Sequence, residues 1–439
     1  MRIHYLALVV NTIRARVISM YRRKARCAYF FAMLSGLSVI LAAAAIGQAC
    51  ADDRERMRLA VDQLVRSQLP SGLFPYDFNF LTGSGTDTKN MTSPNLGRQT
   101  GTAYVLASYH VRLPDTALRR TIEAAIEGFG KLSLPITRTA VQHMIQKTRI
   151  LSLSFGRRTM QRAFNWLGLL YSPEGNGKLV SPDGTYESAW LGVTALALLT
   201  ELEYHRGTGD NRYAGLRAAW LRGILSLKLP GGGFRAAPHY VGEEHYFNGE
   251  GWLALAVYAD MFREDRATAS MLAQLDDYLL NRYSQHWNQM FYSWGTMAAE
   301  VRYATTRDQR FQRFIKSQAS DFLARLREKP KDESRLNCAN LEGLAAAARV
   351  LGSHSSRDRP LVQQLRSRID PAMAENRKLQ IQPGQDRIVF ADGTYLWSAQ
   401  LQGYAGAFRG GPFDPAMRID HTIHCLSAMM ILDRPASPR

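Results

Sequence analysis

The chain has 439 residues, of which 46% are hydrophobic and 21% charged, the balance of a folded globular protein with a sizeable core. This composition excludes a disordered, collagen-like or low-complexity chain. The formal net charge is +17, and because residues 1–49 hold seven Lys and Arg and no acid, 48 basic and 38 acidic residues leave +10 on the rest. That excess fits either a basic protein without a charged partner or attraction to an anionic one. Since we find no nucleic-acid-binding motif, we expect an acidic polysaccharide or a phospholipid surface rather than nucleic acid.

The first 49 residues have the pattern of an export signal. The basic stretch "YRRKAR" (21–26) precedes an uncharged apolar run at 27–47, and small residues come just before Cys50. We predict cleavage before Cys50, although the run of 21 residues is also long enough to remain as a membrane anchor. Basic residues ahead of the run place the rest of the chain outside the cytoplasm in either case. We therefore expect a periplasmic or secreted protein whose translation starts at Met1 or Met20, with residues 50–439 as one domain.

Six segments of the chain are rich in Ala and Leu on nearly all sides, as helices buried in a core are. They open with polar residues and Gly or Ser, and they cover 98–110, 187–205, 247–260, 292–304, 338–351 and 419–432. Amphipathic segments, with apolar residues three or four positions apart, alternate with them at 52–68, 116–132, 211–227, 267–283, 309–326 and 359–375. Such pairs are an internal repeat of helical hairpins, which predicts an all-α fold with a buried inner ring and a half-exposed outer ring.

The connectors that lead from an outer to an inner helix are long and carry Gly followed by an aromatic residue. Examples are "SGLFPYDF" (71–78), "DGTY" (183–186) and "GGGF" (231–234). The stretch "DRIVF" (386–390) alternates like a strand and predicts a small β-hairpin in the last connector. Residues 137–184 fit no hairpin, and we interpret them as an insertion.

This arrangement resembles the six-hairpin glycosidase-like superfamily, whose members include glycoside hydrolases, polysaccharide lyases and the helical domain of uronyl C5-epimerases. The resemblance covers roughly residues 52–433 and is best marked at 187–234, from "ESAWLGVTALALL" to "LPGGGF". It implies an (α/α)6 toroid with a small β-hairpin or loop insertions at one mouth, where the inner helices begin and a funnel binds sugars. The resemblance matches no single protein and does not select a reaction.

Acidic residues at the start of buried helices are the main catalytic candidates. Such groups either cap the free amides of the first turn or do chemistry, and a dry mouth would raise the pKa of a working acid. The candidates are Glu187, Glu250, Glu342 and Asp420, together with His421. In a ring of six, the second helix faces the fifth and the third faces the sixth, so Glu187 should face Glu342 and Glu250 should face Asp420. Paired carboxylates across a sugar are what glycoside hydrolysis needs.

Residues of the connectors and first helical turns are candidates for substrate binding. Flat aromatic rings stack on pyranose rings, and Arg pairs with the carboxylate of a uronate. These candidates are Tyr76, Asp77, Arg98, Gln99, Tyr240, Tyr246, Asn248, Trp294, Asn340 and Arg418. The sequence thus predicts an exported enzyme that hydrolyses glycosidic bonds of an acidic poly- or oligosaccharide without a cofactor.

Two alternative functions stay open on the sequence. A uronate lyase or C5-epimerase would use His or Tyr as base and acid, and His421, Tyr240, His245, Asn340 and Arg98 are available for such a site. A non-catalytic envelope protein would instead bind glycan and assist its assembly or secretion.

Histidines and cysteines near the C-terminus raise the question of a metal site. His421, His424 and Cys425 share one helical turn, and Cys338 begins the neighbouring inner segment. Zinc needs three or four well-placed ligands, and we predict no metal here. The two cysteines could instead pair once in an oxidising compartment.

Overall fold

The computed structural model describes residues 52–86, 92–136, 177–240, 242–328, 336–354 and 356–433. The chain divides into two units, Met1–Arg56 and Met57–Arg439. Of the first unit, residues 52–56 are described and are helical. The ring fold and the candidate site belong to the second unit.

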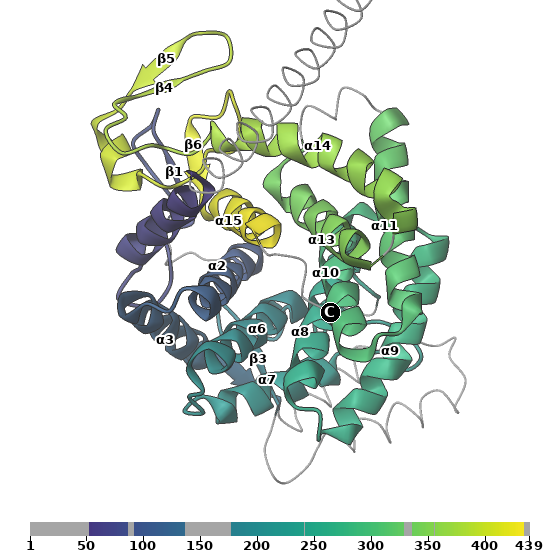
Figure 1. The fold of residues 1–439 in the computed structure, drawn as a ribbon. Helices are drawn as coiled ribbons and strands as arrows, with labels where there is room; N and C mark the ends of the chain where they lie inside the picture. The colour runs from purple at the N-terminus through teal and green to yellow at the C-terminus, as the bar shows by residue number, and fades with distance from the viewer. Residues whose placement is uncertain are drawn as a thin grey trace, which may run out of the picture. The chain divides into compact units, whose positions relative to one another are not determined.

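Six buried helices form the inner part of this unit. They are α2 (Ser93–Arg112), α6 (Leu191–Thr208), α8 (His245–Met261), α10 (Gln289–Thr306), α13 (Cys338–His354) and α15 (Ile419–Asp433). Each packs against the next, and α15 packs against α2, so that the six helices close a ring (Figure 1). Every residue of α6 from Leu191 to Tyr204 is buried, which is why its sequence shows no polar face.

The amphipathic helices lie outside this ring. They are the helix at residues 57–67, α3 (Thr116–Lys131), α7 (Ala214–Ser226), α9 (Arg266–Gln285), α11 (Gln309–Glu328) and α14 (Arg359–Arg377). The last five each pack on the inner helix that precedes them in the chain. In α3, for example, Leu118, Ile122 and Phe129 are buried on one face, and the Asp115 carboxylate accepts from the Leu118 amide at 2.7 Å to cap the helix. The predicted all-α (α/α)6 toroid is confirmed.

The described residues also contain short antiparallel strand pairs and two 3-10 turns. The strand pairs are β1 (Asp77–Asn79) with β6 (Ala416–Arg418), β2 (Ser133–Pro135) with β3 (Lys178–Val180), and β4 (Arg387–Val389) with β5 (Tyr395–Trp397). The turns are η2 (Ser356–Asp358) and η3 (Ala399–Tyr404). The β4–β5 pair confirms the hairpin predicted from 386–390. Most of the predicted insertion, residues 137–176, lies outside the described residues.

No helix in the described ranges is long and apolar enough to cross a membrane. The apolar run at 27–47 lies outside those ranges, so the predicted signal or anchor stays a prediction.

One hydrogen bond recurs where a long connector meets an inner helix. A side chain near the start of the helix accepts from a connector backbone amide: Gln99 from Phe74 at 2.7 Å, Thr194 from Val180 at 3.0 Å, Asn248 from Phe234 at 2.7 Å, and Thr422 from Phe408 at 3.0 Å. At Gly233, the residue before Phe234, the lack of a side chain makes this approach possible, because an added Cβ would lie 2.2 Å from the Asn248 Oδ1 atom. The connectors with the Gly-aromatic signature at 71–78 and 231–234 are thus attached to the ring through the amides of Phe74 and Phe234.

Replacing Asn248 by alanine should lower the free energy of unfolding by about 1–3 kcal/mol, because the buried Phe234 amide loses its acceptor. The same change removes the donor to the Tyr283 hydroxyl at 3.0 Å. Urea denaturation measures the effect, and Asn281→Ala on the exposed face of α9 is the matched control, with little change expected. Unchanged stability together with lost saccharide binding would mean that Asn248 faces the ligand after all.

Candidate functional site

A cavity of about 380 Å³ lies inside the ring and is lined from all six inner helices, near the ends where they begin. Its wall contains six residues that the sequence predicted for the site: Arg98, Tyr246, Glu250, Trp294, Glu342 and Asp420. It also contains residues that the sequence analysis did not propose for the site, among them Tyr104, Trp190, Glu244, Phe247, Met290 and His424. His424 lies four positions after Asp420 on α15, so helical spacing from a predicted residue could have found it.

Glu250 is the buried acid of this wall. Its side chain is only 2% exposed, and its Oε2 atom has no hydrogen-bond partner among the described residues. Burial raises the pKa of Glu250 well above its usual range, because a charge in this environment would be poorly solvated. A carboxyl group whose pKa is raised by burial and that faces a cavity is suited to donate a proton.

Gly192 on α6 provides the room for this acid. A Cβ at Gly192 would lie 1.9 Å from Glu250 Oε2 and 2.6 Å from the Phe247 ring. The absence of a side chain therefore lets α6 and α8 approach each other at the cavity wall.

The sequence predicts a saccharide ligand, and if this ligand binds in the cavity, Gly192→Ala should displace Glu250 and Phe247 and weaken its binding at least about tenfold, equivalent to ~1.4 kcal/mol. Isothermal titration calorimetry with a saccharide bound by the wild type measures this. The control is Gly215→Ala on α7, where nothing lies within 4 Å of an added Cβ. Unchanged affinity in Gly192→Ala would show that the ligand does not reach this wall.

Asp420 is held by two arginines. Arg98 Nε donates to Asp420 Oδ2 at 3.0 Å and Arg418 Nε donates to Oδ1 at 3.0 Å, while Arg418 Nη2 also contacts Oδ2. Burial alone would raise the pKa of Asp420, but the hydrogen bond and charge of Arg418 outweigh it and hold that pKa well below its usual range. Asp420 is therefore an anion at neutral pH and is not a proton donor.

Both guanidinium groups lie over the Tyr76 ring, Arg98 at 5.1 Å and Arg418 at 5.6 Å from its centroid. Tyr76 and Arg418 do not line the cavity, but they contact Arg98 and Asp420, which do. Two cations against one carboxylate leave one positive charge in this cluster, a favourable setting for an anionic group.

Glu342 and His424 form a pair across α13 and α15. His424 Nδ1 lies 2.9 Å from Glu342 Oε2, and Glu342 is 2% exposed. Burial lowers the pKa of His424, but the charge and hydrogen bond of Glu342 raise it by more, so the net pKa lies above its ordinary value. The imidazole is therefore biased toward the protonated form at the cavity wall.

Aromatic rings form another part of the wall. Tyr246 and Trp294 meet edge to face with centroids 6.2 Å apart, and Trp190 meets Phe247 at 5.3 Å. Burial raises the pKa of Tyr246, so its phenol stays protonated near neutral pH. These rings offer flat faces for a sugar, whereas Tyr246 is a poor base.

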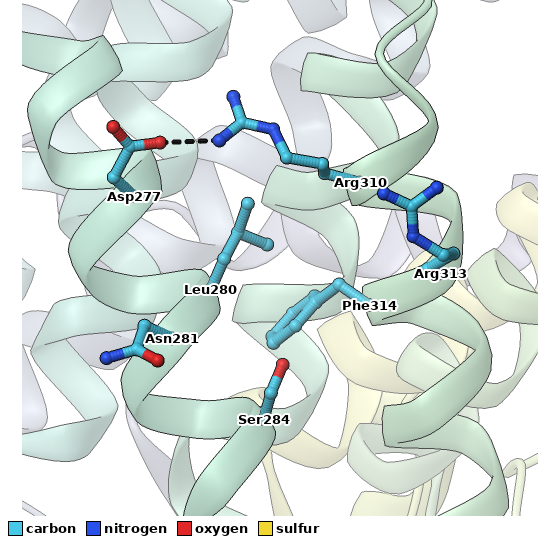
Figure 2. Close-up of a pocket in the computed structure, with 7 residues that line it drawn as sticks. All are labelled: Asp277, Leu280, Asn281, Ser284, Arg310, Arg313 and Phe314. Carbon is cyan, nitrogen blue, oxygen red and sulfur yellow. Dashed lines mark hydrogen bonds and ion pairs between the residues drawn. The ribbon is translucent and has the colours of Figure 1, made fainter.

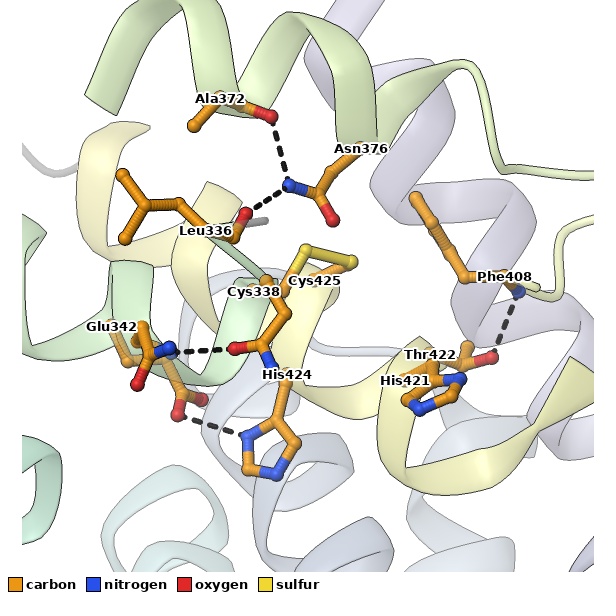
Figure 3. Close-up of a disulfide and its surroundings, with 12 residues drawn as sticks. Leu336, Cys338, Glu342, Ala372, Asn376, Phe408, His421, Thr422, His424 and Cys425 are labelled. Atoms are coloured by element: carbon orange, nitrogen blue, oxygen red, sulfur yellow. Dashed lines mark hydrogen bonds and ion pairs between the residues drawn. A yellow bond between two sulfur atoms is a disulfide. The ribbon is translucent and has the colours of Figure 1, made fainter. Parts of the chain in front are cut away.

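Glu187 and His421 were predicted as catalytic residues, and the structure places both outside the cavity. Helix α6 begins at Leu191, and Glu187 is exposed in the preceding loop. There the Asp183 carboxylate accepts from the amide and hydroxyl of Thr185 at 2.9 and 2.8 Å, a turn that competes with an earlier helix start. His421 points away from the Glu342–His424 contact (Figure 3) and packs instead beside Gly410.

Besides Tyr76 and Arg418, five further residues predicted to bind substrate lie outside the cavity: Asp77, Gln99, Tyr240, Asn248 and Asn340. Gln99 and Asn248 accept the connector amides described above. Asp77 accepts from the Thr86 amide at 2.7 Å, and Tyr240 is 44% exposed in its loop. For Asn340, the backbone amide is bonded to the Asn337 side chain at 3.1 Å, which closes the first turn of α13.

Cys338 and Cys425 form a disulfide. Because their sulfur atoms are bonded to each other, neither is a thiolate that could bind zinc. Within the described ranges, no group of three or more His, Cys, Asp or Glu side chains is placed to hold a metal ion.

A second hollow lies on the outside of the ring, between α9 and α11 (Figure 2). It has a volume of about 470 Å³, and its walls include Leu280, Phe314 and the ion pair of Asp277 with Arg310. It contains none of the predicted site residues, so the cavity inside the ring is the better candidate for a functional site.

Two solved structures have the same ring fold. One is an unsaturated glucuronyl hydrolase specific for heparin, with a TM-score of 0.50 and 11% identity over 87% of this chain and 96% of that one. The other is cellobiose 2-epimerase from Spirochaeta thermophila, with a TM-score of 0.50 and 14% identity over 89% and 98%. No family model and no curated protein matches the chain. At these identities the likeness shows the fold, and it confirms the predicted resemblance to the six-hairpin toroids at that level.

Proposed function

We propose that this protein is a carbohydrate-active enzyme that cleaves a glycosidic bond of a saccharide held in the ring cavity. Glu250 is the general acid in this proposal. The observation that carries it is a buried carboxyl group without a hydrogen-bond partner among the described residues, with a raised pKa, on a wall that also presents aromatic rings. A glycoside hydrolase needs one protonated and one ionised carboxyl group, and Asp420 is the candidate for the second.

A saccharide that carries a carboxylate would find its cationic partner on the Arg98 side of the cavity, away from Glu244 and Glu342, which also line the wall. Arg98 and Arg418 exceed Asp420 by one charge, and the inner helices begin here, so their positive dipole ends lie near the ligand. A volume of about 380 Å³ is near the lower end of the ~300–1,000 Å³ of ligand sites, which favours a short oligosaccharide or a chain end. One of the two similar structures is a hydrolase named for glucuronyl substrates.

Epimerisation or lyase chemistry is the second candidate, and the Glu342–His424 pair is the observation that favours it. A histidine at the cavity wall could move a proton at a sugar carbon, and the other similar structure is an epimerase. In that case His424 takes the role that the sequence analysis gave to His421.

We also propose that the protein is exported. The signal-like N-terminus motivates this, and the Cys338–Cys425 disulfide supports it, because disulfides persist mainly in oxidising compartments. Fractionation of cells that express the full chain would test it, and recovery in the cytoplasm with intact residues 1–49 would contradict export.

Incubation of the purified protein with a panel of neutral and uronate-containing oligosaccharides tests the main proposal. New reducing ends without ultraviolet absorbance of an unsaturated uronate would support hydrolysis. Absorbance that rises with the reducing ends would favour a lyase, and deuterium uptake from heavy water without cleavage would favour an epimerase. Binding without any of these signals would support the non-catalytic glycan-binding alternative.

A further inference from the structure

The Cys338–Cys425 disulfide joins two inner helices at the end where they line the cavity. Cys338 is the first residue of α13 and Cys425 is the seventh of α15, and their Cα atoms are 4.7 Å apart. Both side chains are 3% exposed. The two cysteines are 87 residues apart in sequence, so the disulfide links two segments that are not neighbours along the chain.

The bond stands next to the Glu342–His424 pair (Figure 3). His424 directly precedes Cys425, and Glu342 follows Cys338 by four residues, one helical turn along the same face of α13. The 2.9 Å contact between His424 Nδ1 and Glu342 Oε2 is thus a second link between the same two helices, one turn from the disulfide.

Hydrogen bonds from α14 and α10 also hold the start of α13. Asn376 Nδ2 on α14 donates to the Leu336 carbonyl at 2.8 Å, and Ser293 on α10 donates to the Ala339 carbonyl at 2.8 Å. These contacts fix this end of α13 against α14 and α10. Between α13 and α15, the disulfide and the Glu342–His424 contact lie at this end, while Arg349 donates to the Ile431 carbonyl at 3.3 Å further along the two helices. A small shift at that interface would act directly on the Glu342–His424 distance.

We propose that the Cys338–Cys425 disulfide is a positioning element of the cavity, which keeps His424 in contact with Glu342 at the wall where the ligand binds. The proposal rests on the proposed function only for its effect on turnover, since the contact can be measured without a substrate. Cys338 and Cys425 act through the pair and do not themselves line the cavity.

The titration of His424 reports the contact. Glu342 on α13 and Asp420 on α15 favour the protonated imidazole, Arg98 on α2 and burial oppose it, and Glu250 on α8 lines the same cavity. Loss of the Glu342 contact should therefore lower the midpoint of the His424 titration. NMR of the histidine ring protons measures it, and His424→Gln assigns the signal.

The test compares the wild type with the Cys338→Ala/Cys425→Ala double variant. Leu118→Ala, buried on α3 and away from α13 and α15, is a control that lowers the melting temperature without touching the pair. We expect both variants to melt at a lower temperature and only the cysteine variant to show the lowered His424 midpoint. An unchanged midpoint in the folded double variant would overturn the proposal, because packing alone would then position the pair.

If the double variant does not fold, the wild type can be compared before and after reduction with dithiothreitol. The reagent closes to a cyclic disulfide as the protein gains two thiols, which a thiol assay counts. The same fall in the His424 midpoint is expected, and an unchanged midpoint with two free thiols would contradict the proposal. Turnover is a separate measurement, so a chain that proves to have no activity would sink the proposed function and leave this result standing.

Discussion

Glu250→Gln is expected to lower kcat by about 10²–10⁴-fold with little change in KM, because glutamine keeps the shape of the side chain and cannot donate the proton. The reason lies in its position: the carboxyl is buried in the cavity wall, and one of its oxygens has no hydrogen-bond partner in the part of the chain that the structure describes. Steady-state kinetics on the saccharide that the wild type turns over measures the effect. Glu187→Gln is the matched control, since Glu187 is exposed and outside the cavity, and it should behave like the wild type.

The free energy of unfolding of Glu250→Gln should distinguish a loss of catalysis from misfolding. The folded pKa of Glu250 is raised, so its contribution to stability is present below the ordinary pKa of 4.5 and is lost as pH rises toward the folded pKa. Glutamine does not ionise, so Glu250→Gln avoids this pH-dependent loss of stability. The variant should be at least as stable as the wild type at neutral pH. An inactive variant that is also much less stable would contradict this assignment.

Arg302→Leu is expected to lower the free energy of unfolding by about 3–5 kcal/mol, because it leaves a buried carboxyl group without its cation. Arg302 on α10 donates to Asp276 Oδ2 on α9 through two nitrogens, at 2.9 and 2.7 Å. Trp252 on α8 donates to the other oxygen at 2.7 Å, and Asp276 is 2% exposed. Three helices therefore meet at one carboxylate. Burial raises the pKa of Asp276 to about 6 even beside Arg302, so we expect the acid to take up a proton at neutral pH in the variant.

The neighbouring residue supplies a control for this prediction. Asp277 pairs with Arg310 at 2.7 Å on the exposed side of the same helix (Figure 2), where the two side chains are 65% and 51% exposed. Arg310→Leu should cost less than about 1 kcal/mol, because water and salt screen an exposed pair. Urea denaturation measures the free energy of unfolding of both variants. Equal losses in Arg302→Leu and Arg310→Leu would contradict the expectation that the buried ion pair contributes more to stability than the exposed one.

The ring itself could be predicted because its signal is spread over the whole chain. Segments such as 187–205 are apolar on every side, and only a helix surrounded by others can bury such a surface. The predicted inner segments all overlap the observed inner helices, and the outer ones agree equally well. Errors occur at the ends, as at Glu187, where a hydrogen-bonded turn around Asp183 delays the start of α6.

The direction of single side chains could not be predicted, for the same reason that made the helices recognisable. In a helix that is apolar all round, no stripe marks the face toward the cavity. Asn248 and Glu250 are two residues apart on α8 and so point to nearly opposite sides, one to a connector and the other to the cavity. His421 and His424 share one turn of α15, yet only His424 reaches the cavity wall. Trp190 and Phe247 were missed because an aromatic residue at such a position is usually part of the core.

A crystal structure of Glu250→Gln soaked with the oligosaccharide that the wild type turns over would show directly where the sugar binds. We predict a sugar inside the ring, with a ring face against Trp294 or Trp190 and the glycosidic oxygen within hydrogen-bond reach of the residue 250 side chain. A sugar bound only in the hollow between α9 and α11, or elsewhere outside the ring, would contradict it.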